Sequence, residues 1–91
     1  MESKTQFPDT FTEVALDLRQ NVLFLDSNSQ LHNPYGPSVK FADGSEWYHI
    51  HGKRHRTDGP AIIHVSGLIS YWVNGEPVDQ KNFERLYGTR K

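Results

Sequence analysis

The sequence predicts a mainly β protein: an antiparallel β-meander of about five to six short strands, built from 23-residue hairpin repeats, with one C-terminal helix. Two observations predict this fold. Leu31–Pro37 aligns with Arg54–Pro60 at an offset of 23 residues, and further matches follow at the same offset. Short stretches rich in aromatic and β-branched residues also alternate with glycine turns, which is typical of strands joined by tight turns.

Each repeat unit contains H-x-x-x-G-P and two alternating stretches, each followed by a glycine turn. The residues matched at this offset are Val39 and Ile62, Gly44 and Gly67, Tyr48 and Tyr71, Ile50 and Val73, and Gly52 and Gly75. A weaker copy lies upstream, where Leu25 is expected in the place of Tyr48 and Asn28-Ser29 in that of Asn74-Gly75. The repeats therefore predict strands over Pro37–Ala42, Ser45–Ile50, Pro60–Val65 and Leu68–Val73.

The turns between these strands have the composition of two-residue hairpins. Asp43-Gly44 and Asn74-Gly75 are hairpin signals, because both central residues of a type I′ turn require a positive φ. Pro37 and Pro60 each open a strand, where the missing N–H of proline is tolerated.

The segments outside the repeats are predicted less uniformly. Phe11–Arg19 fits both a strand alternation and a helical stripe, and we favour a strand. A further strand is expected over Val22–Asp26. Near the end of the chain, Asp79 is a good N-cap for a helix over Gln80–Tyr87, which Gly88 would end at the C′ position.

The period of two along a strand assigns side chains to faces. Tyr48, Ile50, Ile69, Tyr71 and Val73 are expected on one face, which forms the core under Phe83 and Leu86. Trp47, His49, Ser70 and Trp72 are expected on the opposite face. These tryptophans either form an exposed binding face or a second hydrophobic layer under the loops, and the pattern leaves both readings open.

Composition limits the class of protein. The chain has 91 residues, which predicts a single domain, with residues 1–12 as a flexible N-terminus, a repeat sheet over 22–77 and a capping helix over 79–87. The absence of cysteine excludes disulfides and thiolate metal sites. The chain shows no signal peptide and no apolar run long enough to span a membrane, so we expect a cytoplasmic protein.

Charge is segregated along the chain. The total is −1, but Met1–Glu46 carries −4 and Trp47–Lys91 carries +3. Such an asymmetry would orient a partner, or a second copy of the chain paired through an open sheet edge.

The segment Asp43–Ile63, DGSEWYHIHGKRHRTDGPAII, resembles the repeat D-G-S-x-x-W-Y-x-x-G-x-x-H-R-x-D-G-P-A of small proteins and repeat arrays of tailed bacteriophages and large DNA viruses. These repeats are similar to MORN-type β-hairpin repeats. The resemblance covers roughly Val22–Pro77 and implies a phage accessory protein that contacts other proteins, without a catalytic activity or a cofactor. The first unit departs from the pattern, because Asn33 stands in the place of Arg56 and Tyr35 in that of Asp58.

Other chemistries find less support in the sequence. His49, His51 and His55 suggest a metal site, but His51 lies in a turn and no fourth ligand is evident, so we expect no metal. The alternative for His32 and His55 is a structural role, in which each forms a hydrogen bond with a loop backbone. Because the chain has no nucleophile elbow and no phosphate-binding glycine loop, we expect no catalytic residues and no enzyme.

Binding is therefore the expected function. Trp, Tyr and Arg are enriched at interface hot spots, and the candidate partner-binding residues are Trp47, His49, His51, Arg54, His55, Arg56 and Trp72. We expect a host protein as the partner, with modulation, and more specifically inhibition, as the effect. The alternative is a binder of single-stranded nucleic acid or a nucleotide, with bases stacked on the tryptophans.

Overall fold

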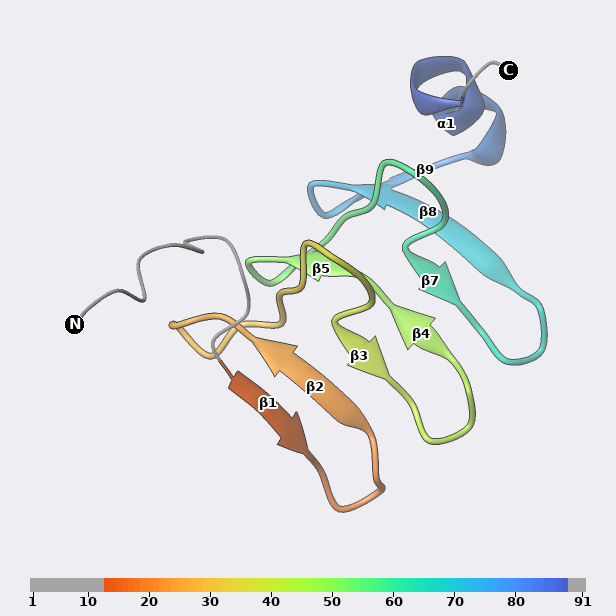
Figure 1. Cartoon of the computed structure of the whole chain (residues 1–91). Helices are drawn as coiled ribbons and strands as arrows, with labels where there is room; N and C mark the ends of the chain where they lie inside the picture. Colours follow the sequence, from red (N-terminus) through yellow and green to blue (C-terminus); the bar gives the residue numbers. More distant parts are fainter. Residues whose placement is uncertain (1–12, 89–91) are drawn as a thin grey trace.

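A computed structural model of the chain describes residues 13–88 (Figure 1). The elements in this part of the chain are, in order, β1 (Glu13–Leu16), β2 (Val22–Leu25), β3 (Val39–Lys40), β4 (Glu46–Trp47), β5 (His49–Ile50), β6 (Lys53–Arg54), β7 (Ile62–Ile63), β8 (Ile69–Val73), β9 (Glu76–Val78) and α1 (Gln80–Tyr87). The expected flexible N-terminus, residues 1–12, lies outside the described residues.

The strands form one seven-stranded antiparallel sheet in the order β1-β2-β3-β4-β7-β8-β9, beside a two-stranded sheet of β5 and β6. Figure 1 shows the large sheet as a single twisted layer, with α1 at the end that follows β9. The predicted fold class, an antiparallel meander with one C-terminal helix, is confirmed. Phe11–Arg19 contains a strand rather than a helix, because Glu13–Leu16 pairs with Val22–Leu25 along its whole length.

The repeat is visible in the backbone hydrogen bonds. Ser38 N–H donates to the Trp47 carbonyl, and 23 residues later Ala61 N–H donates to the Ser70 carbonyl. Four more backbone bonds of the first unit recur in the second at the same offset. Written from the N–H donor to the carbonyl acceptor, first unit before second, these are Asn33→His49 and Arg56→Trp72; Phe41→Ser45 and His64→Leu68; Gly44→Phe41 and Gly67→His64; and Gly52→Leu31 and Gly75→Arg54. The two units are therefore the same structure made twice.

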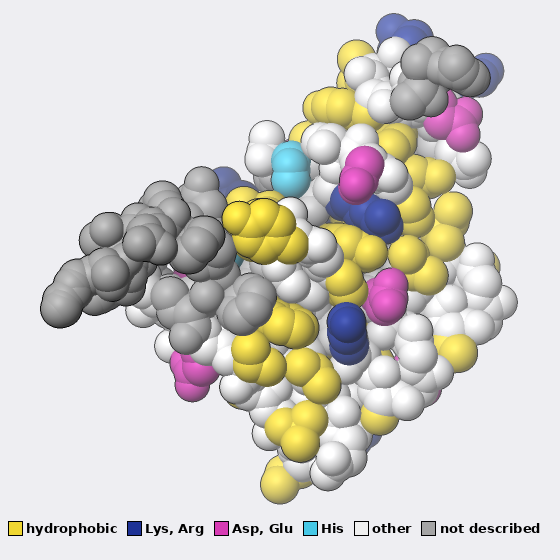
Figure 2. Space-filling view, in the orientation of Figure 1, with side chains coloured by type: hydrophobic (Ala, Val, Ile, Leu, Met, Phe, Trp, Pro, Cys, Tyr) yellow, Lys and Arg dark blue, Asp and Glu magenta, His cyan; other side chains and the backbone are white. Residues whose placement is uncertain are grey.

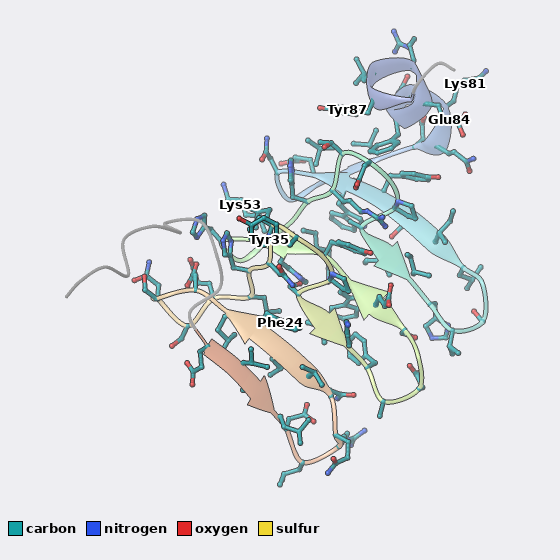
Figure 3. The ribbon with its side chains drawn as sticks, in the orientation of Figure 1. Phe24, Tyr35, Lys53, Lys81, Glu84 and Tyr87 are labelled. Atoms are coloured by element: carbon teal, nitrogen blue, oxygen red, sulfur yellow. The ribbon has the colours of Figure 1, made fainter. Side chains whose placement is uncertain are left out.

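The upstream copy is shifted by one residue relative to the prediction. Phe24 N–H, on β2 (Figure 3), donates to the Ser38 carbonyl. In the next unit, Tyr48 N–H makes the equivalent bond to the Ala61 carbonyl. Phe24, and not Leu25, therefore takes the place of Tyr48. The shift arises in the turn that follows: Asp26 N–H bonds to the Gln30 carbonyl across three residues, whereas Ile50 and Lys53 pair across only two.

The turns are of two kinds, of which the sequence predicted one. His51 and Gly52, like Asn74 and Gly75, all have positive φ, as a two-residue type I′ turn requires. At Asp43-Gly44 only Gly44 has a positive φ, and its N–H donates to the Phe41 carbonyl. This is the three-residue hairpin loop that ends in a left-handed glycine, and Gly67 repeats it.

The expected strand over Ser45–Ile50 is divided in two. Tyr48 falls between β4, which pairs with β7, and β5, which pairs with β6. The chain thus leaves the large sheet at Tyr48 to form a short cross-hairpin. Strands β6 and β9, which complete the cross-hairpins, were not predicted because they are short and contain charged residues or proline.

The core differs from the predicted one. The apolar residues that are fully buried are Val39, Ala61 and Phe83, and they are accompanied by buried polar residues, Asp26, His32, Asn33, Ser38, Ser45 and His49. Ile69 and Leu86, expected in the core, are 45% and 63% exposed. A sheet of one layer has no second sheet to cover its faces, so burial is concentrated in the loops and at the junctions between units.

The terminal helix forms as predicted at its start. The Asp79 carboxylate accepts a hydrogen bond from Asn82 N–H, and Phe83 packs against Tyr71 with ring centroids 4.4 Å apart. The prediction for its end was wrong in detail: Gly88 has φ −68° rather than a left-handed conformation. No helix among residues 13–88 is both long and apolar enough to cross a membrane.

Candidate partner-binding surface

The structure separates the seven candidate residues into three groups. Trp47, Arg54 and Trp72 form a stacked cluster, with His49 beside it, which we call the Trp–Arg clamp. Arg56 and His55 line a second groove, and His51 belongs to a network with Asp26 and His32. A single binding face that contains all seven is therefore not formed.

In the Trp–Arg clamp, one guanidinium contacts two indole rings. The Arg54 Cζ atom lies 5.2 Å from the centroid of Trp47 and 4.8 Å from that of Trp72, both within the range of cation–π attraction. The Trp72 ring is oriented by its Nε1–H, which donates to the Ser70 hydroxyl at 2.9 Å. All three clamp side chains are half-buried, so they form neither a fully exposed face nor a closed second layer.

The charge of Arg54 is not neutralised by a carboxylate within residues 13–88. Its Nε atom is buried and makes no hydrogen bond to the described residues. Arg56, two residues later, is the opposite case, because its Nε donates to the Asp58 carboxylate at 2.8 Å. The clamp thus positions a cation that has no anionic partner among residues 13–88.

His49 lies beside the clamp and is 6% exposed, so its side chain is buried and does not form part of an exposed binding face. Its Nδ1 lies 2.7 Å from the hydroxyl of Ser38, which in turn donates to the Trp47 carbonyl. Burial, with a smaller contribution from the positive charge of Arg54, lowers the pKa of His49 to about 4. His49 is therefore neutral at pH 7, and its ring lies 6.2 Å from that of Trp47, centroid to centroid.

A cationic groove of about 350 Å³ adjoins the clamp. It is lined by His49, Gly52, Lys53, Arg54, Trp72 and Gly75. Lys53 is exposed at its rim, so the groove presents two positive side chains beside an indole ring. Its chemistry suits a carboxylate or another anion next to an apolar group.

A larger open groove of about 560 Å³ lies between the two H-x-x-x-G-P loops. It shares no lining residue with the cationic groove. Here the Arg56 guanidinium stacks on Tyr48 at 4.0 Å and donates to both Asp58 and the Pro60 carbonyl. The bonds of Arg56 within its own loop indicate that it holds the loop in shape.

Asn33 confirms this structural role of Arg56. The Asn33 amide donates to the Pro37 carbonyl at 3.0 Å, which is the same bond made 23 residues earlier by a shorter side chain. The Arg–Asp pair accordingly exists only in the second unit among the described residues. What the two units share at this position is a side chain that donates a hydrogen bond to the carbonyl of the loop proline.

The two repeat histidines also have the structural role considered as the alternative. His32 Nδ1 accepts a hydrogen bond from His51 N–H at 2.8 Å, and His55 Nδ1 accepts one from Asn74 N–H at 3.0 Å. In both units, the histidine thus binds the first residue of the following two-residue turn. His51 and Asn74 both have a positive φ, which non-glycine residues rarely adopt, so this bond holds the turn at a strained residue.

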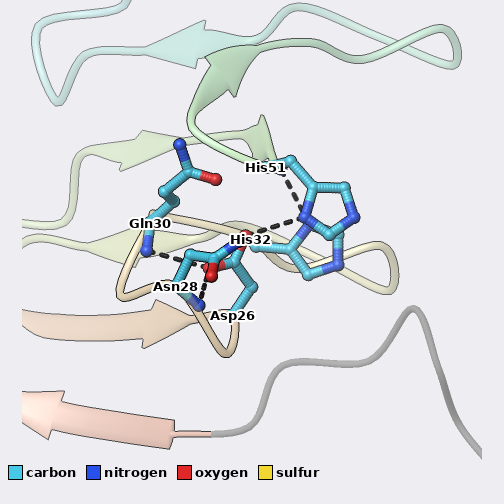
Figure 4. Close-up of polar contacts among 5 residues, drawn as sticks. All are labelled: Asp26, Asn28, Gln30, His32 and His51. Atoms are coloured by element: carbon cyan, nitrogen blue, oxygen red, sulfur yellow. Dashed lines mark hydrogen bonds and ion pairs between the residues drawn. The ribbon is translucent and has the colours of Figure 1, made fainter.

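Sequence reasoning missed Asp26, a buried residue that forms a network with buried His32 and exposed His51 (Figure 4). One oxygen of Asp26 accepts from Asn28 and Gln30 N–H, and the other lies 2.7 Å from His51 Nδ1. These bonds, first that of His51, keep the pKa of the Asp26 carboxyl below its usual value. The signal available in the sequence was an aspartate directly before a turn, where its side chain caps backbone N–H groups.

Asp26, His32 and His51 each offer a potential metal-ligand atom, all within 4.8 Å of one another, whereas the sequence had pointed to His49, His51 and His55. His32 Nδ1, however, accepts a backbone N–H, and His51 Nδ1 faces the Asp26 carboxylate. The two rings stack with centroids 3.9 Å apart at an interplanar angle of 22°. The contacts are those of a structural network.

Comparisons of the chain with protein-family models, with curated proteins and with solved structures give no match.

Proposed function

We propose that this protein is a non-catalytic protein-interaction domain that binds an acidic site on a partner protein through the Trp–Arg clamp. The observation that supports the proposal is the state of Arg54, which is held by Trp47 and Trp72 and has no carboxylate among residues 13–88. A guanidinium fixed before binding loses little side-chain entropy when it meets a carboxylate. Arginine beside tryptophan is also the composition of interface hot spots.

The single-layer sheet supports the same proposal. Figure 2 shows hydrophobic side chains at the surface over much of one face of the molecule, mixed with Lys, Arg, Asp and Glu. Exposed large hydrophobic residues among those described include Tyr35, Leu68 and Ile69. Such a mixed surface is typical of interfaces between proteins that also exist separately.

The partner that we propose is a host protein in the cytoplasm of a bacterium, because the repeats resemble those of phage accessory proteins. Binding at the clamp would cover an acidic surface of the host protein and so modulate, and in the simplest case inhibit, its activity. Lys53 and Arg54 face the partner in this proposal, and they belong to the half of the chain with net charge +3.

The test compares Arg54→Gln with Lys40→Gln, which removes the same charge from an exposed side chain on β3. Each protein is immobilised and used to capture proteins from nuclease-treated bacterial lysate, with quantification by mass spectrometry. We expect the wild type and Lys40→Gln to retain the same host protein, and Arg54→Gln, Arg54→Lys and Trp47→Ala to lose it while remaining folded by circular dichroism. Lysine keeps the charge but cannot stack as a plane between the indoles.

Two results would contradict the proposal. Folded Arg54→Gln that captures the same protein as the wild type would remove the clamp from the interface. Capture from untreated lysate that is lost in nuclease-treated lysate would favour the nucleic-acid alternative, in which bases stack on Trp47 and Trp72. Oligonucleotide binding that weakens log-linearly with salt would accompany that result.

A further inference from the structure

The outer edge of β1 is a second place where the molecule can accept a partner. β1 is the first strand in the order of the large sheet, and within residues 13–88 only β2 pairs with it. An edge strand presents a row of backbone N–H and C=O groups that can pair with another chain. Only those backbone groups of β1 that point away from β2 are available for such pairing.

The hydrogen bonds of β2 determine which backbone groups of β1 these are. Phe24 N–H donates to Ser38 and its carbonyl accepts from His32, so both backbone groups of Phe24 point away from β1. In an antiparallel ladder the direction alternates from residue to residue, and Phe24 is opposite Val14. The backbone groups of Val14 and Leu16 therefore point out of the sheet, whereas those of Ala15 point inward to Leu23.

The opposite edge of the sheet is closed to pairing. β9, the last strand in the order, has Pro77 at its centre, and proline has no N–H to donate. β1 contains no proline, and the side chains of Val14 and Leu16 are 53% and 61% exposed. Among residues 13–88, the sheet is thus protected at the β9 edge and unpaired at the β1 edge.

The charges beside this edge favour a basic segment over a second copy of the chain. Glu13 and Asp17 flank the outward pair Val14 and Leu16, and Asn21 and Arg19 N–H bind the Asp17 carboxylate, which lowers its pKa. Two copies of β1 paired about Ala15 would place Glu13 opposite Asp17 twice, and like charges directly opposite are destabilising. A segment with lysine or arginine at each end of an alternating apolar run would instead meet opposite charges.

We propose that the edge of β1 takes up an extended segment of a partner protein as an additional antiparallel strand, and that this segment has alternating apolar residues flanked by basic ones. The inference concerns a surface apart from the Trp–Arg clamp, although it shares with the proposed function the premise that the protein binds other proteins. Backbone pairing would supply affinity, and the contacts with Val14, Leu16 and the flanking acids would supply specificity.

The test uses two end-blocked peptides, titrated into ¹⁵N-labelled protein. The first is Thr-Lys-Val-Thr-Val-Lys-Thr, which, centred on Ala15, places lysine opposite Glu13 and Asp17 and valine opposite Val14 and Leu16, and the second has glutamate in place of both lysines. We expect the lysine peptide to shift the amide signals of Val14 and Leu16 and to slow their hydrogen exchange at least tenfold. Leu16→Pro removes an outward N–H and leaves the ladder to β2 intact, so it should weaken peptide binding at least tenfold. Leu16→Thr keeps the N–H and changes only the side-chain contact, so it should weaken binding less than Leu16→Pro does.

Several results would overturn this inference. They are equal binding of both peptides, unchanged binding by Leu16→Pro, shifts confined to other strands, or sedimentation of the wild type as a dimer that Leu16→Pro dissociates. If Leu16→Pro loses the β1–β2 hairpin, the test uses the wild type alone. The inference then fails if the lysine peptide does not slow hydrogen exchange at the Val14 amide more than the glutamate peptide does. Arg54→Gln should bind the lysine peptide normally, which separates failure of this inference from failure of the clamp proposal.

Discussion

His49 makes the stability of this protein depend on pH between about 6.5 and 4. In the folded protein its pKa is about 4, whereas an unperturbed histidine titrates near 6.5. Between these values the unfolded chain binds more protons than the folded one, so stability falls as the pH is lowered through this range. For one histidine with these two pKa values, linkage gives a loss of about 2 kcal/mol at pH 5 and about 3 kcal/mol at pH 4, relative to pH 7.

The aspartates with lowered pKa affect stability mainly at a lower pH than His49 does. Asp17, Asp26 and Asp43 all have folded pKa values below 3.8, so their stabilising contributions are present above that pH and are lost below it. Between pH 6.5 and pH 4, their carboxylates therefore contribute little to the change in stability.

Urea unfolding followed by tryptophan fluorescence at pH 7, 5 and 4 measures this effect. The matched variant is His49→Leu, because the upstream copy carries Leu25 at the corresponding position and Ser38 keeps its bond to the Trp47 carbonyl. We expect the wild type to show the full loss and His49→Leu to lose less than about 1 kcal/mol. An NMR titration that places the pKa of His49 near 6.5, or equal pH dependence of the two proteins, would refute the reasoning.

Two further predictions concern packing. A Cβ atom at Gly59 would lie 2.8 Å from the Arg56 Cζ, so Gly59→Ala should displace this guanidinium and cost about 1–2 kcal/mol in urea unfolding. Gly36→Ala, where the nearest atom is 3.8 Å away, should cost less than about 0.5 kcal/mol, and equal costs would contradict the role of Arg56. Phe83→Ala should cost about 3 kcal/mol by thermal or urea unfolding, because its ring is 4% exposed. The exposed Leu86 serves as its control, and Leu86→Ala should stay within about 0.5 kcal/mol of the wild type.

The sequence predicted the parts of the fold that depend on local geometry. Asn74-Gly75 has the positive φ values expected of its turn, and Asp79 caps the helix that follows it. The 23-residue repeat predicted the order of strands, because units with the same turns make the same backbone bonds. The fold class followed from these signals together.

The sequence could not predict which side chains are buried. Alternation assigns two faces to a strand, but Tyr48 interrupts the strand and the single layer buries neither face completely. His49 is buried because Ser38, eleven residues earlier, offers it a hydroxyl, and Asp26 meets His51 only through the stacking of two units. Contacts of this kind depend on the register between units, in which one added turn residue moved Phe24 into the place expected for Leu25.

The repetition of one set of backbone bonds also determines how the molecule opens. Each strand of the large sheet has its main contacts with its neighbours in the strand order, so the sheet between residues 13 and 88 is close to a one-dimensional array. In such a one-dimensional array the free energy of local opening is lowest at the ends and highest in the middle. Amide protons of β3, β4 and β7 should therefore exchange with solvent far more slowly than those of β1, and the molecule should unfold from its edges inward.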